Sequence, residues 1–353
     1  MNEKAYYESV NTKNELKLRE LQKELPPFCR EFFIGMKASV SSRTLLAYAY
    51  DLGIFFDFIH QNNPICAKKP VNEFTIDLLD QISPMDIEEY LSYLKYYEKD
   101  GTEHTNDEGG LKRKLSALRS FYHYYYKNGL IEDDPTVKVD MPKIHEKNII
   151  RLDVDEVAKL LDEVESGENL TARQQQYHEK TKIRDLAMMT LLLGTGIRVS
   201  ECVGLDIEDL DFRDDRIRII RKGGKEEFVY FGAEVREALM NYIEDSRSKI
   251  IPKEGHEHAL FYSIQRRRIS VQAVENLVTE YASQVTTFKH ITPHKLRSTY
   301  GTSLYRQTGD IYLVAEVLGH NDVNTTRKHY AALDDDKKRQ AASAVQLHQK
   351  KQR

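Results

Sequence analysis

The hydrophobic pattern of the first 140 residues is helical. Apolar side chains recur every three or four positions from Arg43 to Gln61, and Ser41 and Ser42 precede that run as candidate capping residues. The same spacing predicts helices at 13–24, Phe74 to Leu79, Pro84 to Tyr97 and Leu111 to Lys127. The polar, glycine-containing stretch from Lys99 to Gly110 predicts a loop. This part of the chain therefore predicts a compact, mainly α-helical domain.

The second half combines both periodicities. Residues Arg216 to Ile220 and Glu226 to Phe231 alternate as strands do, and Lys222-Gly223-Gly224-Lys225 between them predicts a hairpin turn. Helices are expected from Asp153 or Asp155 to Glu165, from Lys182 to Leu193, from Ile197 to Leu205 and again from Val271 onward. This pattern predicts an α+β domain with a small antiparallel sheet.

The length of 353 residues is typical of two domains. We expect a helical domain at 1–140, a linker at 141–150 that is polar and contains Pro142, and a second domain at 151–353. Within the last of these, the segment 334–347 has acidic residues at its start, basic ones after them and a small apolar face, which predicts a short C-terminal helix.

The overall charge does not indicate a nucleic-acid-binding protein, although several short segments are basic. The net charge is −4, and residues 1–145 carry 19 Lys and Arg against 23 Asp and Glu, so any affinity for nucleic acid must come from patches. A charge run is usually a solvated face, which makes each patch weak evidence alone. The candidate DNA-binding residues are Lys112, Arg113, Lys114, Arg119, Arg221, Lys225, Arg266, Arg267 and Arg268. On the helix expected at 111–127 we assign most of the interleaved tyrosines to the core.

Compartment follows from what the chain contains. The N-terminal residues carry no apolar signal segment, and the most apolar stretch, Leu186 to Leu193, is too short to span a bilayer. Cys29, Cys66 and Cys202 are scattered without a CxxC pair. We therefore expect a cytoplasmic protein with no membrane insertion and with free thiols.

The residues best suited to catalysis lie between His294 and Tyr330. Pro293 is suited to open a helix, and its first turn would bring His294 and Arg297 to one face, where both could address a phosphate oxygen. A second imidazole, His320, follows in Leu-Gly-His, and Tyr330 is a candidate nucleophile ten positions later. This set suggests attack on a phosphodiester.

These residues also allow a structural role or a metal site. A single His or Tyr is more often part of a core or surface than of an active site. His290 and His294 have the spacing of a zinc pair on a helix, but Pro293 lies between them and no Cys or acidic residue is near enough to complete the ligand set. No GxxxxGK[ST] phosphate loop occurs either, since Gly194-Thr-Gly196 lacks the following Lys. We expect no metal and no cofactor.

Five motifs in order resemble the tyrosine recombinase (phage integrase) family. They are Gly194-Thr-Gly-Ile-Arg198-Val-Ser-Glu201, Lys222-Gly-Gly-Lys-Glu-Glu, His294-Lys-Leu-Arg297, Leu318-Gly-His320 and Tyr330. The resemblance covers both halves, because residues 111–139 look like the end of that family's DNA-clasping helical domain. Within the family the chain looks most like the Xer recombinases, in particular the type in which one recombinase acts alone.

The resemblance implies a role for each motif residue. Arg198 and Arg297 would hold the non-bridging oxygens of the scissile phosphate, with Glu201 as a supporting residue. Lys222 would protonate the departing 5′ oxygen, His294 would transfer protons at the tyrosine, and His320 would donate to the phosphate. Tyr330 would form a 3′-phosphotyrosyl link. Two guanidinium groups and an imidazole can stabilise the transition-state charge without a metal, and the covalent link stores the bond energy for religation.

One spacing departs from the family pattern. The family usually places its tyrosine nine residues after the histidine of Leu-Gly-His, and here His329 holds that position. Because a histidine cannot form the phosphotyrosine, Tyr330 remains the candidate. We expect the extra residue to be absorbed in the loop 321–324. Tyr300, Tyr305 and Tyr312 fall inside preceding helical segments, where core packing is the default.

The predicted function is site-specific DNA recombination through a Holliday junction, with resolution of chromosome dimers at a terminus site as its biological use. The resemblance implies double-stranded DNA with inverted half-sites as partner, a tetramer on two DNA sites linked by the C-terminal segments, and an FtsK-type DNA translocase as a possible regulator. The alternatives are a mobile-element integrase or excisionase, a type IB topoisomerase-like relaxing enzyme, and a catalytically silent DNA-binding regulator. The complete set of motif residues disfavours the silent regulator.

Overall fold

The computed structural model describes residues 3–145, 150–221 and 224–320. The chain forms two compact units. One, here called the helical unit, comprises Tyr7–Lys147, and the other, the mixed unit, comprises Met1–Tyr6 together with Asn148–Arg353. The chain crosses between the units twice, after Tyr6 and after Lys147, and the second crossing lies within the segment 141–150. The expected C-terminal helix at 334–347 and the loop 321–324 lie outside the described residues.

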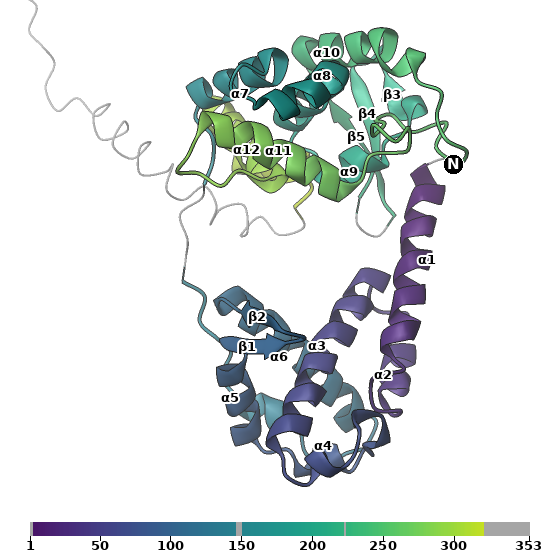
Figure 1. Ribbon diagram of the computed structural model, residues 1–353, viewed down its shortest axis with the longest axis vertical. Helices are drawn as coiled ribbons and strands as arrows, with labels where there is room; N and C mark the ends of the chain where they lie inside the picture. The colour runs from purple at the N-terminus through teal and green to yellow at the C-terminus, as the bar shows by residue number, and fades with distance from the viewer. Residues whose placement is uncertain (1–2, 146–149, 222–223, 321–353) are drawn as a thin grey trace, which may run out of the picture. The chain divides into compact units, whose positions relative to one another are not determined.

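The helical unit is built from amphipathic helices with short connections (Figure 1). The expected start of one of them is confirmed, since the Ser41 hydroxyl accepts from the Thr44 N–H at 3.2 Å. Ser83 and Asp86 form a capping box at another, with Pro84 in the first turn. The α-helices that contribute to this unit are α1 (Glu3–Leu21, beginning in the mixed unit), α2 (Cys29–Met36), α3 (Ser42–Asn62), α4 (Leu78–Gln81), α5 (Pro84–Tyr93) and α6 (Glu108–Lys127).

The predicted loop at 99–110 is wrong for most of its length. It contains part of an antiparallel hairpin of β1 (Tyr96–Lys99) and β2 (Thr102–Thr105), in which Lys99 pairs with Thr102. The turn residues Asp100 and Gly101 have φ of 53° and 71°, the left-handed geometry of a tight hairpin turn. The preceding helix therefore ends at Tyr93 instead of Tyr97, and the helix expected from Phe74 is reduced to the single turn of α4.

Many aromatic rings lie in the core of the helical unit. Phe121 on α6 lies 5.1 Å from the ring of Phe32 and 5.0 Å from that of Tyr125, measured between centroids, and both contacts are edge-to-face. Tyr122 and Tyr125 are fully buried, whereas Tyr126 is exposed. The assignment of most of these tyrosines to the core is thus confirmed.

The mixed unit surrounds a long central helix. α8 (Ala172–Thr195) contacts α7 (Val154–Ser166), α10 (Ala233–Asp245) and α12 (Pro293–Thr308) (Figure 1). Its small sheet is antiparallel, in the order β3 (Leu210–Asp211), β4 (Arg216–Ile220) and β5 (Glu226–Tyr230), with Ile217 opposite Val229. The predicted α+β architecture with a small antiparallel sheet is confirmed.

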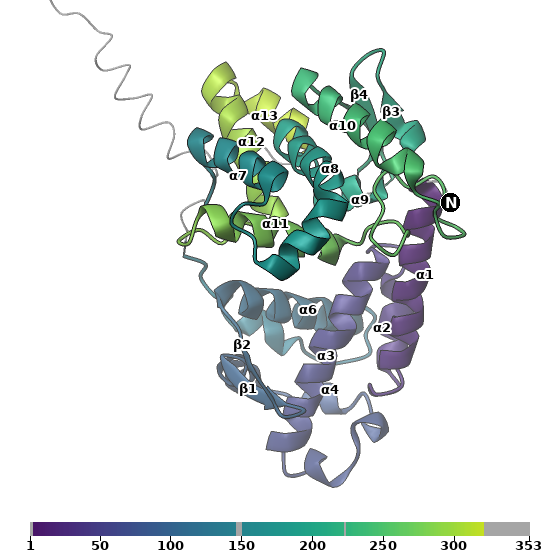
Figure 2. The same ribbon diagram turned by 45° about the horizontal axis from the view of Figure 1, so that its top comes forward.

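Glycine and proline residues mark the ends of three further helices of the mixed unit. Gly196, at φ 63°, ends α8 directly before α9 (Val199–Gly204). Pro293 begins α12, as predicted, after α11 (Val271–Val285). Gly319, at φ 58°, ends α13 (Ile311–Leu318), which packs against α12 (Figure 2). Throughout the described ranges, every helix is too short or too polar to cross a bilayer.

Candidate active site

Arg198 lies at the start of α9, and Glu201 binds both its backbone N–H and its guanidinium group. The Glu201 carboxylate accepts from the backbone N–H of Arg198 at 2.7 Å and from its Nη1 at 2.8 Å. The carboxylate is buried, whereas the Arg198 side chain remains 39% exposed. A buried carboxylate therefore orients a guanidinium group that is itself partly exposed.

Arg297 lies in the second turn of α12 and is only 4% exposed. Its Nη1 donates to the Gly196 carbonyl at 2.6 Å, and its Nη2 donates to the Leu318 carbonyl. The guanidinium group thus joins the end of α8 to the end of α13. His294, three residues earlier on α12, is exposed. His294 and Arg297 therefore lie near the same helix start, as predicted, but only Arg297 is buried.

Three arginine side chains donate to backbone carbonyls at the carboxyl end of α13. Arg198 donates to the Gly319 carbonyl at 3.2 Å, Arg297 to that of Leu318, and Arg221 to those of Leu318 and Val317 at 3.3 and 3.0 Å. The unpaired carbonyls of a helix end carry partial negative charge, which favours cations. His320 follows this helix end directly, so the predicted residues Arg198, Arg297 and His320 meet around one short turn.

A cleft of about 860 Å³ opens beside this turn. Arg198, Arg221 and His320 supply polar groups to it, and β5 and α13 supply apolar ones. Tyr300 also lines the cleft, but burial raises the pKa of its phenol, which makes it a poorer nucleophile than a solvated tyrosine. The expectation that Tyr312 packs in the core is wrong, because this residue is 71% exposed in the first turn of α13.

Two of the predicted catalytic residues, Lys222 and Tyr330, lie outside the described residues. Their roles stay predictions. Lys222 directly follows Arg221 at the end of β4, so it belongs by sequence to the turn that enters β5. Arg198 and His320 offer a guanidinium group and an imidazole to the cleft, groups that suit an anion such as a phosphate, whereas Arg297 is buried and bonded to backbone carbonyls.

The basic residues predicted to bind DNA from α6 differ in what they contact. Lys112 is exposed. Arg113 and Lys114 both pair with the buried Asp51, Lys114 at 3.1 Å, and Lys114 is itself buried. Arg119 donates to the carbonyls of Thr136 and Val139 at 3.2 and 2.5 Å, so it fastens the segment after α6. A direct DNA contact does not fit the structural bonds of Lys114 and Arg119.

The basic candidates of the mixed unit divide in the same way. Arg266, Arg267 and Lys225 are exposed and remain predictions. Arg268 is 5% exposed and donates from Nη1 to the carbonyls of Val203, Gly204 and Leu205 at 3.0, 2.8 and 2.7 Å, and from Nη2 to Asp206. It therefore caps the carboxyl end of α9, the helix that begins at Arg198. Arg221 is buried as well, although it lines the cleft beside His320.

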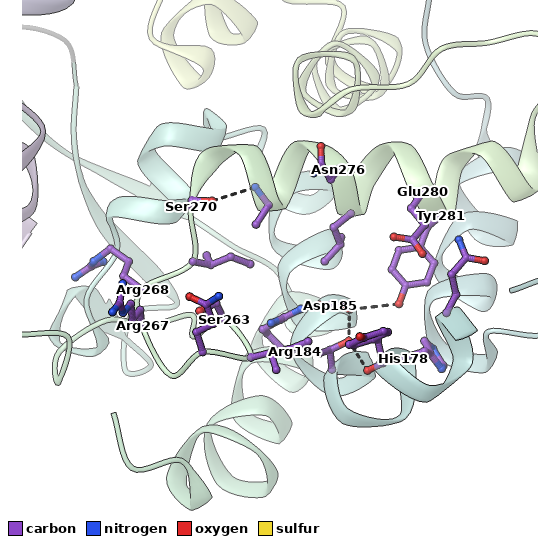
Figure 3. A pocket seen from close by; sticks show the side chains of 18 of the residues that line it. His178, Arg184, Asp185, Ser263, Arg267, Arg268, Ser270, Asn276, Glu280 and Tyr281 are labelled. Carbon is purple, nitrogen blue, oxygen red and sulfur yellow. Dashed lines mark hydrogen bonds and ion pairs between the residues drawn. The ribbon is translucent and has the colours of Figure 1, made fainter. Parts of the chain in front are cut away.

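A second pocket in the mixed unit, of about 580 Å³, lies between α8, α11 and the loop 263–270 (Figure 3). Figure 3 shows Tyr281 pointing toward Asp185, whose carboxylate accepts from Tyr281 at 3.3 Å and from Thr181 at 2.7 Å. Arg184 pairs with the same carboxylate at 2.6 Å. None of the predicted catalytic residues that the structure describes lines this pocket, and its central charges already neutralise one another.

Comparison with known proteins identifies what the chain is similar to. The model of the phage integrase family matches residues 150–337. A tyrosine recombinase XerC of Caldanaerobacter subterraneus subsp. tengcongensis is 32% identical over 338 residues, covering 92% of this chain and 88% of the relative. A tyrosine recombinase XerD of Staphylococcus epidermidis is 30% identical over 295 residues, covering 84% of this chain and 90% of the relative.

Solved structures agree on the fold. The XerH site-specific recombinase bound to palindromic difH substrate, in a post-cleavage complex, matches with a TM-score of 0.63 at 21% identity, over 86% of this chain and 80% of that one. A lambda integrase dimer bound to a COC′ core site matches with a TM-score of 0.60 at 17% identity, over 86% of this chain and 93% of that one. At these identities the likeness concerns the fold.

Proposed function

Because this chain belongs to the phage integrase family of tyrosine recombinases, we propose that it is a recombinase of the Xer type, acting alone as XerS does, that resolves chromosome dimers. As a tyrosine recombinase it is an enzyme of site-specific DNA recombination. Its Xer relatives, at about 30% identity, are named XerC and XerD. The finer assignment to the single-recombinase type rests on the motifs of the sequence.

The observation that carries the proposal is the meeting of Arg198, Arg297 and His320 at the end of α13. They come from α9, α12 and the turn after α13, and the first two lie 99 residues apart in the chain. Arg198 and His320 line one cleft, and the buried Arg297 is bonded to the end of α13 beside it. A guanidinium group and an imidazole at this cleft suit a scissile phosphate, whose transition state carries charge on its equatorial oxygens.

Each remaining step uses a residue of the chain. Tyr330 attacks the phosphate and forms a 3′-phosphotyrosyl link, while Lys222 protonates the departing 5′ oxygen. His294 transfers protons to and from the tyrosine, and Glu201 supports Arg198. Religation reverses these steps without a cofactor, because the covalent link conserves the energy of the broken bond.

At the level of assembly, we propose four protomers on two duplex DNA sites with inverted half-sites, exchanging strands pairwise through a Holliday junction. The setting is the cytoplasm during cell division, at a terminus site of the chromosome, with an FtsK-type translocase as activator. Lys112, Arg113, Lys225, Arg266 and Arg267 are the predicted DNA-binding residues whose exposure suits phosphate contacts.

Trapping the covalent intermediate tests the chemistry. The protein is incubated with fragments of its host's replication-terminus DNA, and protein–DNA adducts are resolved on denaturing gels. Tyr330→Phe should abolish the adduct and leave DNA binding nearly unchanged, because only one oxygen is lost. Tyr312→Phe is the matched control, since it removes the same oxygen from an exposed tyrosine of α13 and should form the adduct at the normal rate.

Two results would contradict the assignment of Tyr330. One is an adduct that persists in Tyr330→Phe, and the other is a peptide map that places the DNA on Tyr300. Relaxation of supercoiled plasmid without any preferred site would instead favour a topoisomerase-like enzyme.

A further inference from the structure

Asp51 on α3 carries a buried carboxylate of the helical unit, and both of its oxygens accept from α6. Oδ1 accepts from Lys114 Nζ at 3.1 Å, and Oδ2 accepts from Arg113 Nη1. Asp51 and Lys114 are both buried, so they already form an ion pair below the surface. Because one cation offsets the charge of the carboxylate, Arg113 is not needed to neutralise it.

Arg113 differs from Lys114 in depth, because its side chain is 52% exposed. The cluster contains two cations and one anion, so one positive charge remains, and Arg113 is the cation at the surface. The residues three and four positions away from Arg113 on α6 are small and uncharged, namely Gly109, Gly110, Ser116 and Ala117. The surplus charge is therefore not neutralised by a residue one turn away on the same helix.

A similar arrangement holds Arg198 in the candidate active site. There the buried Glu201 carboxylate accepts from Arg198 Nη1, and the Arg198 side chain is partly exposed. In each case a carboxylate below the surface fixes one donor of a guanidinium group that reaches solvent. Fixing the side chain in advance lowers the entropy that it loses on binding an anion. The Asp51 contact therefore preorganises Arg113 for an anion outside the protein.

A second ion pair of α3 shows what an ordinary surface contact looks like. Asp57 pairs with Lys99 at 2.6 Å, but both side chains are exposed. Exposed pairs contribute little, because water screens both charges and holding two long side chains costs entropy. The burial of Asp51 distinguishes the Arg113 contact from this one.

We propose that Asp51 is a positioning residue for DNA binding, which holds the Arg113 guanidinium group at the surface in the orientation in which it donates to a DNA phosphate. The proposal rests on the proposed function, in which Arg113 contacts the DNA backbone. A guanidinium group is a planar fork of donors, so its orientation decides whether it meets a phosphate with one donor or two. Asp51 is itself buried and acts through Arg113.

The sign of one mutational effect separates positioning from electrostatics. DNA is a polyanion, so electrostatics alone predicts that removing a negative charge from the protein tightens binding. Asp51→Asn removes such a charge, but its amide has a single acceptor oxygen and cannot hold both cations. We expect this variant to bind a fluorescently labelled DNA duplex of arbitrary sequence about three- to tenfold more weakly, the cost of immobilising one long side chain. Asp57→Asn is the matched control and should bind as tightly as the unaltered protein or more tightly.

A double-variant cycle shows whether Asp51 acts through Arg113. Arg113→Gln should weaken binding and lower the slope of log affinity against log salt by about 1, because one phosphate contact is lost. Asp51→Asn should keep that slope, since Arg113 remains charged. In the Arg113→Gln background, Asp51→Asn should weaken binding by less than about twofold. A merely structural Asp51 would weaken binding by the same factor in both backgrounds.

A further variant covers the case in which Asp51→Asn does not fold, because that substitution leaves Lys114 buried with a weaker partner. Combining Asp51→Asn with Lys114→Met removes both charges of the buried pair and leaves the net charge unchanged. This combined variant should also weaken DNA binding about three- to tenfold, since Arg113 again loses its anchor. Circular dichroism of each variant checks that the helical content is retained.

Tighter or unchanged binding by the Asp51 variants, or an equal loss with and without Arg113, overturns the inference. Either result leaves the proposed function intact, because formation of the covalent adduct is measured separately. If the unaltered protein binds the duplex but forms no adduct with terminus DNA, the proposed function fails, and the binding cycle still decides whether Asp51 positions Arg113.

Discussion

The core of the helical unit contains many aromatic rings among its aliphatic side chains, whereas the core of the mixed unit is mainly aliphatic and has several buried charged groups beside it. Phe32, Phe56 and Phe121 lie at the centre of the first, and Asp51 with Lys114 is its main buried ion pair. In the mixed unit, Arg221, Arg268 and Arg297 are all buried, each bonded to backbone carbonyls at a helix end. Two of these arginines, Arg221 and Arg297, meet at the end of α13, where Arg198 also binds.

The two units are stabilised in different ways, one by packing of aromatic rings and the other in part by buried guanidinium groups. Ring packing spreads its stabilisation over many contacts, so it stabilises the helical unit without depending on one residue. A buried guanidinium costs desolvation and offsets it only with well-placed acceptors, so each one specifies a particular geometry. An active site needs its groups placed to within a fraction of an ångström, which suits the second way.

The largest expected effect comes from breaking one of the buried charges. Arg268→Met leaves Asp206 unpaired and removes the donor to three carbonyls at the end of α9. Loss of one partner of a buried ion pair costs roughly 3–5 kcal/mol, and we expect the upper end here. Hydrogen exchange of peptides covering 199–209 in the full chain should show the loss. Arg267→Met, an exposed neighbour, should leave exchange unchanged, and equal protection in both variants would contradict the capping role.

A deletion in the aromatic core comes next. Phe121→Ala removes a fully buried ring that contacts Phe28, Phe32, Phe56 and Tyr125, and should cost about 3–4 kcal/mol. Exchange should rise across α3 and α6. The control on the same helix is Tyr126→Ala, an exposed site at which a change costs about 0.5 kcal/mol or less. Similar losses in the two variants would mean that the rings do not carry the stability of this unit.

The smallest effect compares one left-handed glycine from each unit. Gly319→Ala and Gly101→Ala both place a Cβ at positive φ, which costs about 1 kcal/mol. Only at Gly319 does the Cβ also meet a side chain, Arg221, so we expect about 1–2 kcal/mol there and slower DNA cleavage. Gly101 has open space around it, and its variant should cleave normally. Equal cleavage rates in single-turnover assays would show that the site tolerates the intrusion.

Local signals explain what the sequence predicts well. Pro293, Ser41 and Gly196 each act on the helix end beside them, and the structure places a helix boundary at each. The β4–β5 hairpin follows from alternation around a Gly-Gly turn. The Asp100-Gly101 turn carried an equally local signal, but all of β2 is exposed, so no hydrophobic alternation supported it.

Long-range contacts explain what the sequence does not predict. Arg266, Arg267 and Arg268 form one basic run, yet only the last is buried, because the fold brings it to the end of α9 more than 60 residues away. Lys114 is buried against Asp51 for the same reason. Nothing in the neighbouring residues separates a basic side chain that faces solvent from one that caps a distant helix.

The cap on α9 has an evolutionary consequence. Arg268 bonds to the carbonyl oxygens of Val203, Gly204 and Leu205, which every amino acid supplies in the same form. The side chains at those positions can drift as far as their packing allows without breaking the cap, whereas a change at Arg268 removes it in a single mutation. Bonds to backbone carbonyls thus concentrate the mutational risk of the helix that follows Arg198 in one side chain, which lies outside the cleft beside α13.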